Sequence, residues 1–236
     1  MINLEYIKKM SFEEKDSLQK ELWHLISSNN IKETRNFLKD FKLEDIFYEN
    51  SFDFEEEPMF NSALSLYQAC LAYEKTKNFD MLNFLLSYGL KASDSDGENN
   101  VLQYYIKFGG SDVNLIGFLL DKKASFESLG KDGWSIIHNC ANYQKTQTLA
   151  LIAKFGANME ARTDVKYKNE NIKQTPLMIA AASKEQPLGE ATKMLISLGV
   201  NLNAKDRNKT ALDYAYDINI QLLQEAGAKS FENLQD

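Results

Sequence analysis

The sequence contains little cysteine, histidine or proline. Its 236 residues include two cysteines, two histidines and three prolines. Cys70 and Cys140 are too few and too far apart for a disulfide framework or a zinc ribbon, so we expect two buried thiols. The sequence also lacks a Gly-Lys-Ser/Thr phosphate loop, a nucleophile elbow and a His-Glu-x-x-His motif. These absences predict a protein that is not an enzyme and holds no metal ion or cofactor.

Long apolar runs and a general excess of basic residues are also missing. The start of the chain has no uncharged run long enough for a signal peptide, and no later stretch reaches the roughly 18 apolar residues of a membrane span. The net charge is −7, but residues 44–57 hold seven acids and no base, which leaves the rest of the chain balanced. We therefore expect a cytoplasmic protein that binds neither membranes nor nucleic acid.

What the sequence does contain is an internal period. Five segments share an apolar run that ends at a glycine or its equivalent: LLSYGLKA from Leu85, LLDKKASF from Leu119, IAKFGANM from Ile152, LISLGVNL from Leu195 and LQEAGAKS from Leu223. The steps between the glycine-equivalent positions are 34, 33, 43 and 28 residues, and these positions are Gly89, Lys123, Gly156, Gly199 and Gly227. Two of the steps match a repeat of about 33 residues.

A second motif lies upstream in each period. The clearest copies are TPLMIAAA from Thr175, SIIHNCA from Ser135 and TALDYA from Thr210, and the weaker ones are NVLQYYI from Asn100 and SALSLYQAC from Ser62. With both motifs in place, residues 61–229 resemble the ankyrin-repeat family. The resemblance implies an all-α fold, a solenoid of stacked helix-turn-helix units with hairpin-like finger loops.

The same alignment predicts the domain organisation. Residues 1–60 are expected to form a helical N-terminal cap, or degenerate repeat, with an acidic-aromatic loop at 44–57. Residues 61–236 are expected to form the ankyrin-repeat array, with a shortened C-terminal capping repeat. Ser11 and Glu14 make a capping-box pattern at the start of the first helix. The step of 43 residues comes from a lengthened finger at 163–174 and a lengthened loop at 183–191, where we expect exposed insertions.

Two details of the second helices can also be predicted. One apolar stripe should pack inward and end at Gly199, and its members are Ala191, Met194, Leu195 and Leu198. Lys123 stands where the other repeats have a glycine, so we expect the helix before it to end differently.

His138 and Cys140 lie two residues apart and raise the question of a catalytic couple. Positions two apart on a helix point to different faces, and no third group that could orient the pair is visible. The resemblance implies instead that His138 hydrogen-bonds a neighbouring finger and that Cys140 is a small buried helix residue.

The resemblance implies that finger tips and exposed first-helix residues bind partner proteins. The expected contact residues of the array are Asn99, Lys107, Phe108, Lys131, Asp132, Trp134, Asn142, Tyr143, Asp206, Arg207 and Lys209. Trp134 follows the finger glycine, where family members usually expose the side chain, and beside Tyr143 it would make an interface anchor. The alternative is a Trp134 that points inward as part of the core.

Residues 44–57 combine their seven acids with four large aromatic rings. One interpretation is that the segment docks into a basic cleft of a partner, and the expected contacts are then Glu44, Asp45, Tyr48, Asp53, Glu55 and Glu56. The other is that the rings pack on the protein's own first repeats. The fingers at 162–173 and 205–209 carry more bases than acids, which indicates either a basic contact surface or ordinary solvated tips.

The predicted function is non-catalytic recognition of another protein. The arginine-poor, lysine-rich composition is typical of an AT-rich bacterial genome, so our specific hypothesis is a bacterial immunity or inhibitor protein. It would be a monomer when free and would block a cognate toxin or enzyme. The alternative is an effector or scaffold that binds host or cellular proteins through its ankyrin face. A remote alternative is an enzyme whose site lies in the first 60 residues, near Trp23 and His24.

Overall fold

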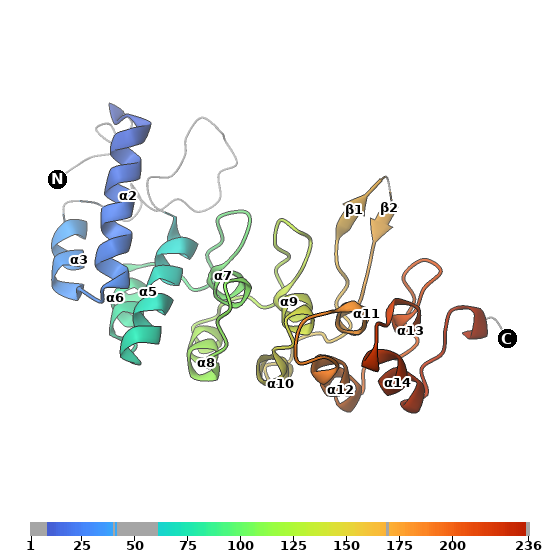
Figure 1. Cartoon of the computed structure of the whole chain (residues 1–236). Helices are drawn as coiled ribbons and strands as arrows, with labels where there is room; N and C mark the ends of the chain where they lie inside the picture. The colour runs from blue at the N-terminus through green and yellow to red at the C-terminus, as the bar shows by residue number, and fades with distance from the viewer. Residues whose placement is uncertain (1–8, 40, 42–60, 169, 235–236) are drawn as a thin grey trace. The chain divides into compact units, whose positions relative to one another are not determined.

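The computed structural model describes residues 9–39, 41, 61–168 and 170–234. These residues are mostly helical and include one two-stranded antiparallel sheet, which confirms the helical fold class (Figure 1). The acidic stretch 44–57 lies outside the described residues, and so do its predicted contacts Glu44, Asp45, Tyr48, Asp53, Glu55 and Glu56. Those contacts therefore stay predictions.

The chain divides into two compact units. The first comprises Met1–Tyr105 with Asp121–Ser125, and the second comprises Ile106–Leu120 with Phe126–Asp236. The N-terminal helices thus belong to the same unit as the first repeats. A separate cap that ends at residue 60 stays a prediction.

The first unit is built from paired helices. Its elements are α2 (Phe12–Ser27), α3 (Ile31–Leu38), α5 (Ser62–Thr76), α6 (Asp80–Tyr88) and the greater part of α7 (Val101–Lys107). The capping box at the start of α2 is confirmed, because the Glu14 N–H donates to Ser11 Oγ and the Ser11 N–H donates to Glu14. The helix α2 packs against α3 and α5, and α5 packs against α6, around fully buried side chains such as Leu22, Leu66 and Leu85.

The second unit repeats one pattern of helices. Its elements are α8 (Val113–Asp121), α9 (Ile136–Asn142), α10 (Thr146–Lys154), β1 (Val165–Tyr167), β2 (Glu170–Ile172), α11 (Pro176–Ala182), α12 (Glu190–Ser197), α13 (Ala211–Tyr214), α14 (Ile218–Glu225) and the 3-10 turn η1 (Glu232–Leu234). The first helices α9, α11 and α13 pack side by side, and so do the second helices α10, α12 and α14. Within this unit the fingers before α9, α11 and α13 project from the same side (Figure 1).

The lengthened finger at 163–174 is a regular β-hairpin. The strands β1 and β2 pair in antiparallel register, with Val165 opposite Ile172 and Tyr167 opposite Glu170. The Thr163 hydroxyl closes the base of this hairpin, because it donates to the Ile172 carbonyl and accepts from the Gln174 N–H. The insertion is therefore an ordered strand pair that extends from the array.

The predicted stripe of α12 is correct except at its end. Ala191 and Leu195 are fully buried and Met194 is partly buried, but 38% of Leu198 is exposed. The helix ends at Ser197, so Leu198 lies beyond its last turn and points outward. Gly199 adopts the expected left-handed conformation with φ of 75°.

Lys123 keeps the conformation of the glycine that it replaces. Its φ is 68°, close to the 75° of Gly199 and the 85° of Gly156 at the equivalent positions. The expectation that this helix ends differently was wrong. The packing of the following residue Ala124, which is buried, favours the same turn in spite of the steric cost that a side chain brings to it.

Lys123→Gly should therefore stabilise the protein. Glycine relieves the left-handed strain of Lys123 and loses part of that gain to chain entropy, so the free energy of unfolding should rise by about 0.5–1 kcal/mol. Urea denaturation followed by circular dichroism measures the change. The matched control is Lys122→Gly, at an exposed neighbour whose φ is not positive. It should lower stability, and equal effects of the two variants would contradict the explanation.

Candidate functional site

Each first helix from α7 onward begins with two residues that cap one another. The residue before the helix and the residue three positions later exchange hydrogen bonds, as the 2.7 Å contact from the Thr210 N–H to Asp213 Oδ2 illustrates. The four pairs are Asn100 with Gln103, Ser135 with His138, Thr175 with Met178, and Thr210 with Asp213. Each pair consists of the first and fourth residues of the second sequence motif, which begins at Asn100, Ser135, Thr175 or Thr210.

Three of the pairs also reach the segment of the next repeat. Asn100 Nδ2 donates to the Ser125 carbonyl at 2.9 Å, His138 Nε2 lies 3.1 Å from the Ala161 carbonyl, and Thr210 Oγ1 donates to the Lys229 carbonyl at 2.8 Å. An amide, an imidazole and a hydroxyl thus make the same connection in different repeats. Each one satisfies a backbone carbonyl and ties the base of a following segment to the helix before it.

His138 makes this connection as a neutral ring. It is fully buried, and Nδ1 accepts from the Ser135 N–H at 3.2 Å, so the proton lies on Nε2 and is donated to Ala161. Burial lowers the pKa of His138 to about 4. Cys140 is also fully buried, and burial raises the pKa of its thiol. The predicted structural roles of His138 and Cys140 are confirmed, since neither group is available as a base or a nucleophile.

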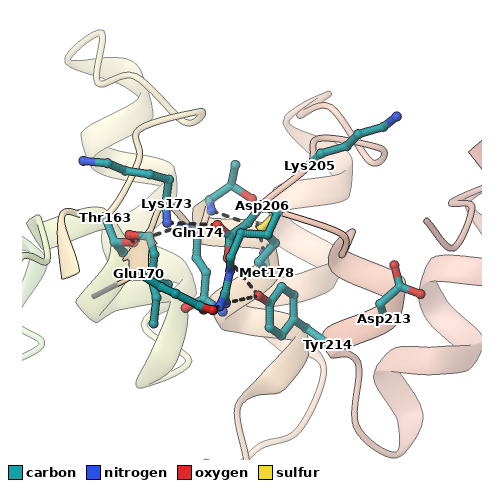
Figure 2. A network of polar contacts seen from close by, with 12 residues as sticks. Thr163, Glu170, Lys173, Gln174, Met178, Lys205, Asp206, Asp213 and Tyr214 are labelled. Carbon is teal, nitrogen blue, oxygen red and sulfur yellow. Dashed lines mark hydrogen bonds and ion pairs between the residues drawn. The ribbon is translucent and has the colours of Figure 1, made fainter. Parts of the chain in front are cut away.

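The pair at α11 departs from this pattern, because neither Thr175 nor Met178 forms a hydrogen bond with the following finger among the described residues. The Met178 sulfur only accepts, at 3.5 Å, from the Thr175 N–H. The two fingers on either side of α11 are joined by other residues (Figure 2). Asp206 Oδ1 accepts from the Lys173 N–H at 3.0 Å, and Arg162 Nη1 donates to the Lys173 and Lys205 carbonyls at 2.9 and 2.8 Å.

Asp206 is the centre of this network. Only 3% of it is exposed, and its Oδ2 accepts from the Tyr214 hydroxyl at 2.8 Å. Arg207 adds a second link between the fingers, because its guanidinium pairs with Glu170 on β2 as well as with Asp206. Glu170 and Tyr214 were not among the residues predicted from the sequence. Their contacts span 37 and 8 residues, and the only signal in the sequence was the mixture of opposite charges in the two fingers.

The fingers before α9 and α11 are joined by close backbone contact at Gly133. The Asp164 N–H donates to the Gly133 carbonyl at 2.8 Å, and Gly133 has a φ of 73°. A Cβ at this position would lie 2.2 Å from the Asp164 carbonyl oxygen. Only glycine fits between the two fingers here.

Comparison with known families agrees with this geometry. A family model described as Ankyrin repeat matches residues 173–207, from the end of the long finger through α11 and α12 into the next finger. Residues 173–207 are an ankyrin repeat. The comparison with curated proteins found no match. Ankyrin repeats typically bind other proteins and do not catalyse reactions, so a protein partner is the general expectation for this array.

Two further findings bear on other kinds of site. None of the described helices is both long and apolar enough to cross a membrane. Within the described ranges, no group of three or more His, Cys, Asp or Glu side chains is placed to hold a metal ion.

The eleven array residues predicted to contact a partner differ in their exposure to solvent. Six are exposed, and these are Phe108, Lys131, Asp132, Tyr143, Arg207 and Lys209. Three are partly buried, and these are Lys107, Trp134 and Asn142. Asn99 and Asp206 are buried, with 8% and 3% exposed, so they offer a partner little surface. The role of these eleven residues in partner binding stays a prediction.

The structure brings some of these residues together and keeps others apart. Lys107 and Asp132 form an ion pair of 2.8 Å. Trp134 precedes α9 and packs its ring 6.4 Å from that of His138, whereas Tyr143 follows the end of α9. Trp134 and Tyr143 thus flank opposite ends of a helix about 10 Å long, and their joint role as an interface anchor stays a prediction.

Gly133→Ala tests the contact between fingers. The added Cβ must displace the Asp164 carbonyl, so the free energy of unfolding should fall by about 2–5 kcal/mol. The control is Gly156→Ala, at a glycine with φ of 85° and no atom within 4 Å of the new Cβ. It carries only the backbone cost of about 1 kcal/mol. Denaturant titration compares the two variants, and equal losses would show that the finger contact is not the cause.

Acidification should destabilise the protein through His138. The unfolded chain takes up a proton near pH 6.5, but the folded ring resists protonation until pH 4. Stability is therefore complete above pH 6.5 and falls below it by about 1.4 kcal/mol per pH unit down to pH 4. Unfolding midpoints at a series of pH values measure the slope. The matched variant His138→Gln should lose this contribution, and an unchanged slope would count against it.

Proposed function

We propose that this ankyrin-repeat protein is a non-catalytic module that binds another protein through its finger tips and the exposed ends of its first helices. The observation that supports this is the contrast between the bases and the tips of the fingers. The bases are tied together through residues such as His138, Gly133 and Asp206, while Lys131, Arg207 and Lys209 lie exposed nearby. A surface that is ordered before binding loses less conformational entropy on association.

We also propose a domain organisation for the chain. Residues 61–236 form one solenoid of stacked repeats and residues 1–60 form its cap. Support comes from the two rows of helices in the second unit, α9, α11 and α13 in one and α10, α12 and α14 in the other. Neighbouring rows of this kind bury apolar faces that a single repeat would leave open.

The more specific proposal is a cytoplasmic bacterial inhibitor, such as an immunity protein that blocks a cognate toxin, which is monomeric before it binds. Its support is the composition of residues 44–57, seven acids with four aromatic rings. Such a segment is complementary in charge to the basic cleft of a nuclease-like enzyme.

The experiment is affinity capture of the tagged full chain from native lysate, followed by measurement of the affinity for the captured partner. The test variant carries Phe108→Ser, Lys131→Glu and Tyr143→Ser on the proposed face. The matched control carries Phe155→Ser, Lys154→Glu and Leu198→Ser, which change exposed residues at the ends of the second helices α10 and α12. The test variant should bind at least about tenfold more weakly and the control should bind like the wild type.

The outcomes separate the proposals. Equal losses in both variants, with unchanged melting temperatures, would contradict binding through the fingers and first helices. A partner whose catalytic activity is blocked at one-to-one stoichiometry supports the inhibitor. Partners that come only from a eukaryotic lysate and keep their activity would replace the inhibitor by an effector or scaffold.

A further inference from the structure

The two fingers that flank α11 carry an excess of positive charge in a chain that is negative overall. Residues 162–174 and 205–209 hold seven basic and three acidic residues, whereas the whole chain has a net charge of −7. Lys173 pairs with Asp164, and Arg207 pairs with Glu170 and Asp206. The other five cations form no ion pair with a described residue, and they are Arg162, Lys166, Lys168, Lys205 and Lys209.

Three of these cations are held in place without being neutralised. Lys209 Nζ lies 5.0 Å from the centre of the Tyr214 ring, and Lys205 Nζ lies 5.3 Å from that of Phe231. A ring attracts the ammonium group but leaves its charge free to meet a carboxylate. Arg162 is positioned by two carbonyls, which also leave its charge in place. In Figure 2, Lys205 extends away from the hydrogen-bonded network.

Two open hollows adjoin these cations. One, of about 330 Å³, is lined by Glu170, Arg207, Asn208 and Lys209. The other, of about 590 Å³, is lined by Asn208, Lys209, Asp213, Phe231 and Glu232. Asn208 and Lys209 border both hollows, so one extended chain can pass from the first to the second. The Asn208 amide can donate to and accept from the backbone of such a chain.

We propose that the surface formed by Arg162, Lys205, Asn208 and Lys209, with the two hollows, binds an extended carboxylate-rich segment of a partner protein. This rests on the proposed function and names the chemistry of the partner at these two fingers. Acidic side chains of the segment pair with Lys205, Lys209 and Arg162, and its neutral backbone lies over the hollows.

The acids of the surface favour a peptide over a nucleic acid. Glu170 lines the first hollow, and Asp213 and Glu232 line the second. A nucleic acid carries a phosphate at every step and would place negative charge against these carboxylates. A peptide carries charge only on its side chains, so neutral groups can lie opposite Glu170 and Asp213.

The test uses the full chain and a fluorescein-labelled peptide of alternating glutamate and glycine. Fluorescence anisotropy gives its affinity for the wild type, for Lys205→Gln/Lys209→Gln and for the control Lys154→Gln/Lys184→Gln. Lys184 is a matched control, because its Nζ also lies over a ring, 5.1 Å from the centre of Tyr216, but on the loop after α11. We expect about a tenfold loss in the test variant, no loss in the control, and no binding of the same peptide with glutamine in place of glutamate.

Three results would overturn the proposal: failure of the glutamate peptide to bind the wild type, equal affinities in the test and control variants, or tighter binding of single-stranded DNA than of the peptide. Measuring the affinity of the natural partner for the Lys205→Gln/Lys209→Gln variant distinguishes this proposal from the proposed function. If that partner binds Lys205→Gln/Lys209→Gln like the wild type, the acidic-segment proposal fails while binding through the other fingers stands.

Discussion

The hydrogen bond from the start of one repeat to the following segment is the interaction on which the array depends. Each link satisfies a backbone carbonyl that would otherwise lose its partner near the protein interior. The link requires a side chain that can donate a hydrogen bond to that carbonyl, and it does not require one residue type. Asn100, His138 and Thr210 all supply such a donor. At α11, where Thr175 and Met178 make no such link to a described residue, Arg162 and Asp206 hold the fingers together by a different route.

The base and the tip of each finger are under different constraints, so the fold can stay constant while the exposed side chains differ between repeats. Hydrogen bonding and close packing restrict which residues can stand near the base of a finger, as the contact between Gly133 and Asp164 shows. Residues near the tip are more exposed and can be charged, as Lys131 and Lys209 are. Recognition of a partner can therefore rest on side chains whose replacement leaves the fold in place.

Much of the fold could be predicted because its causes are local. Short stretches of sequence determine the repeat period, the helix caps and the positions of small buried residues. The roles of Ser11, His138, Cys140 and Gly199 could therefore be predicted from such stretches. The site was harder to predict because its contacts join distant residues. Asp206 resembles an exposed finger acid in the sequence, but three contacts of its carboxylate, with Lys173, Arg207 and Tyr214, make it a buried centre. Lys123 likewise shows that packing can override the preference of a residue for its backbone conformation.

The β-hairpin of the long finger, residues 163–174, can change its exposed side chains without losing the contacts that hold it. Its base is closed by Thr163, and its second strand is tied to the neighbouring finger through Glu170 and Arg207. Lys166 and Lys168, near the tip, make no ion pair with any described residue. Substitution of these two lysines therefore removes none of the ion pairs that hold the hairpin, and its surface charge can change on an unchanged scaffold.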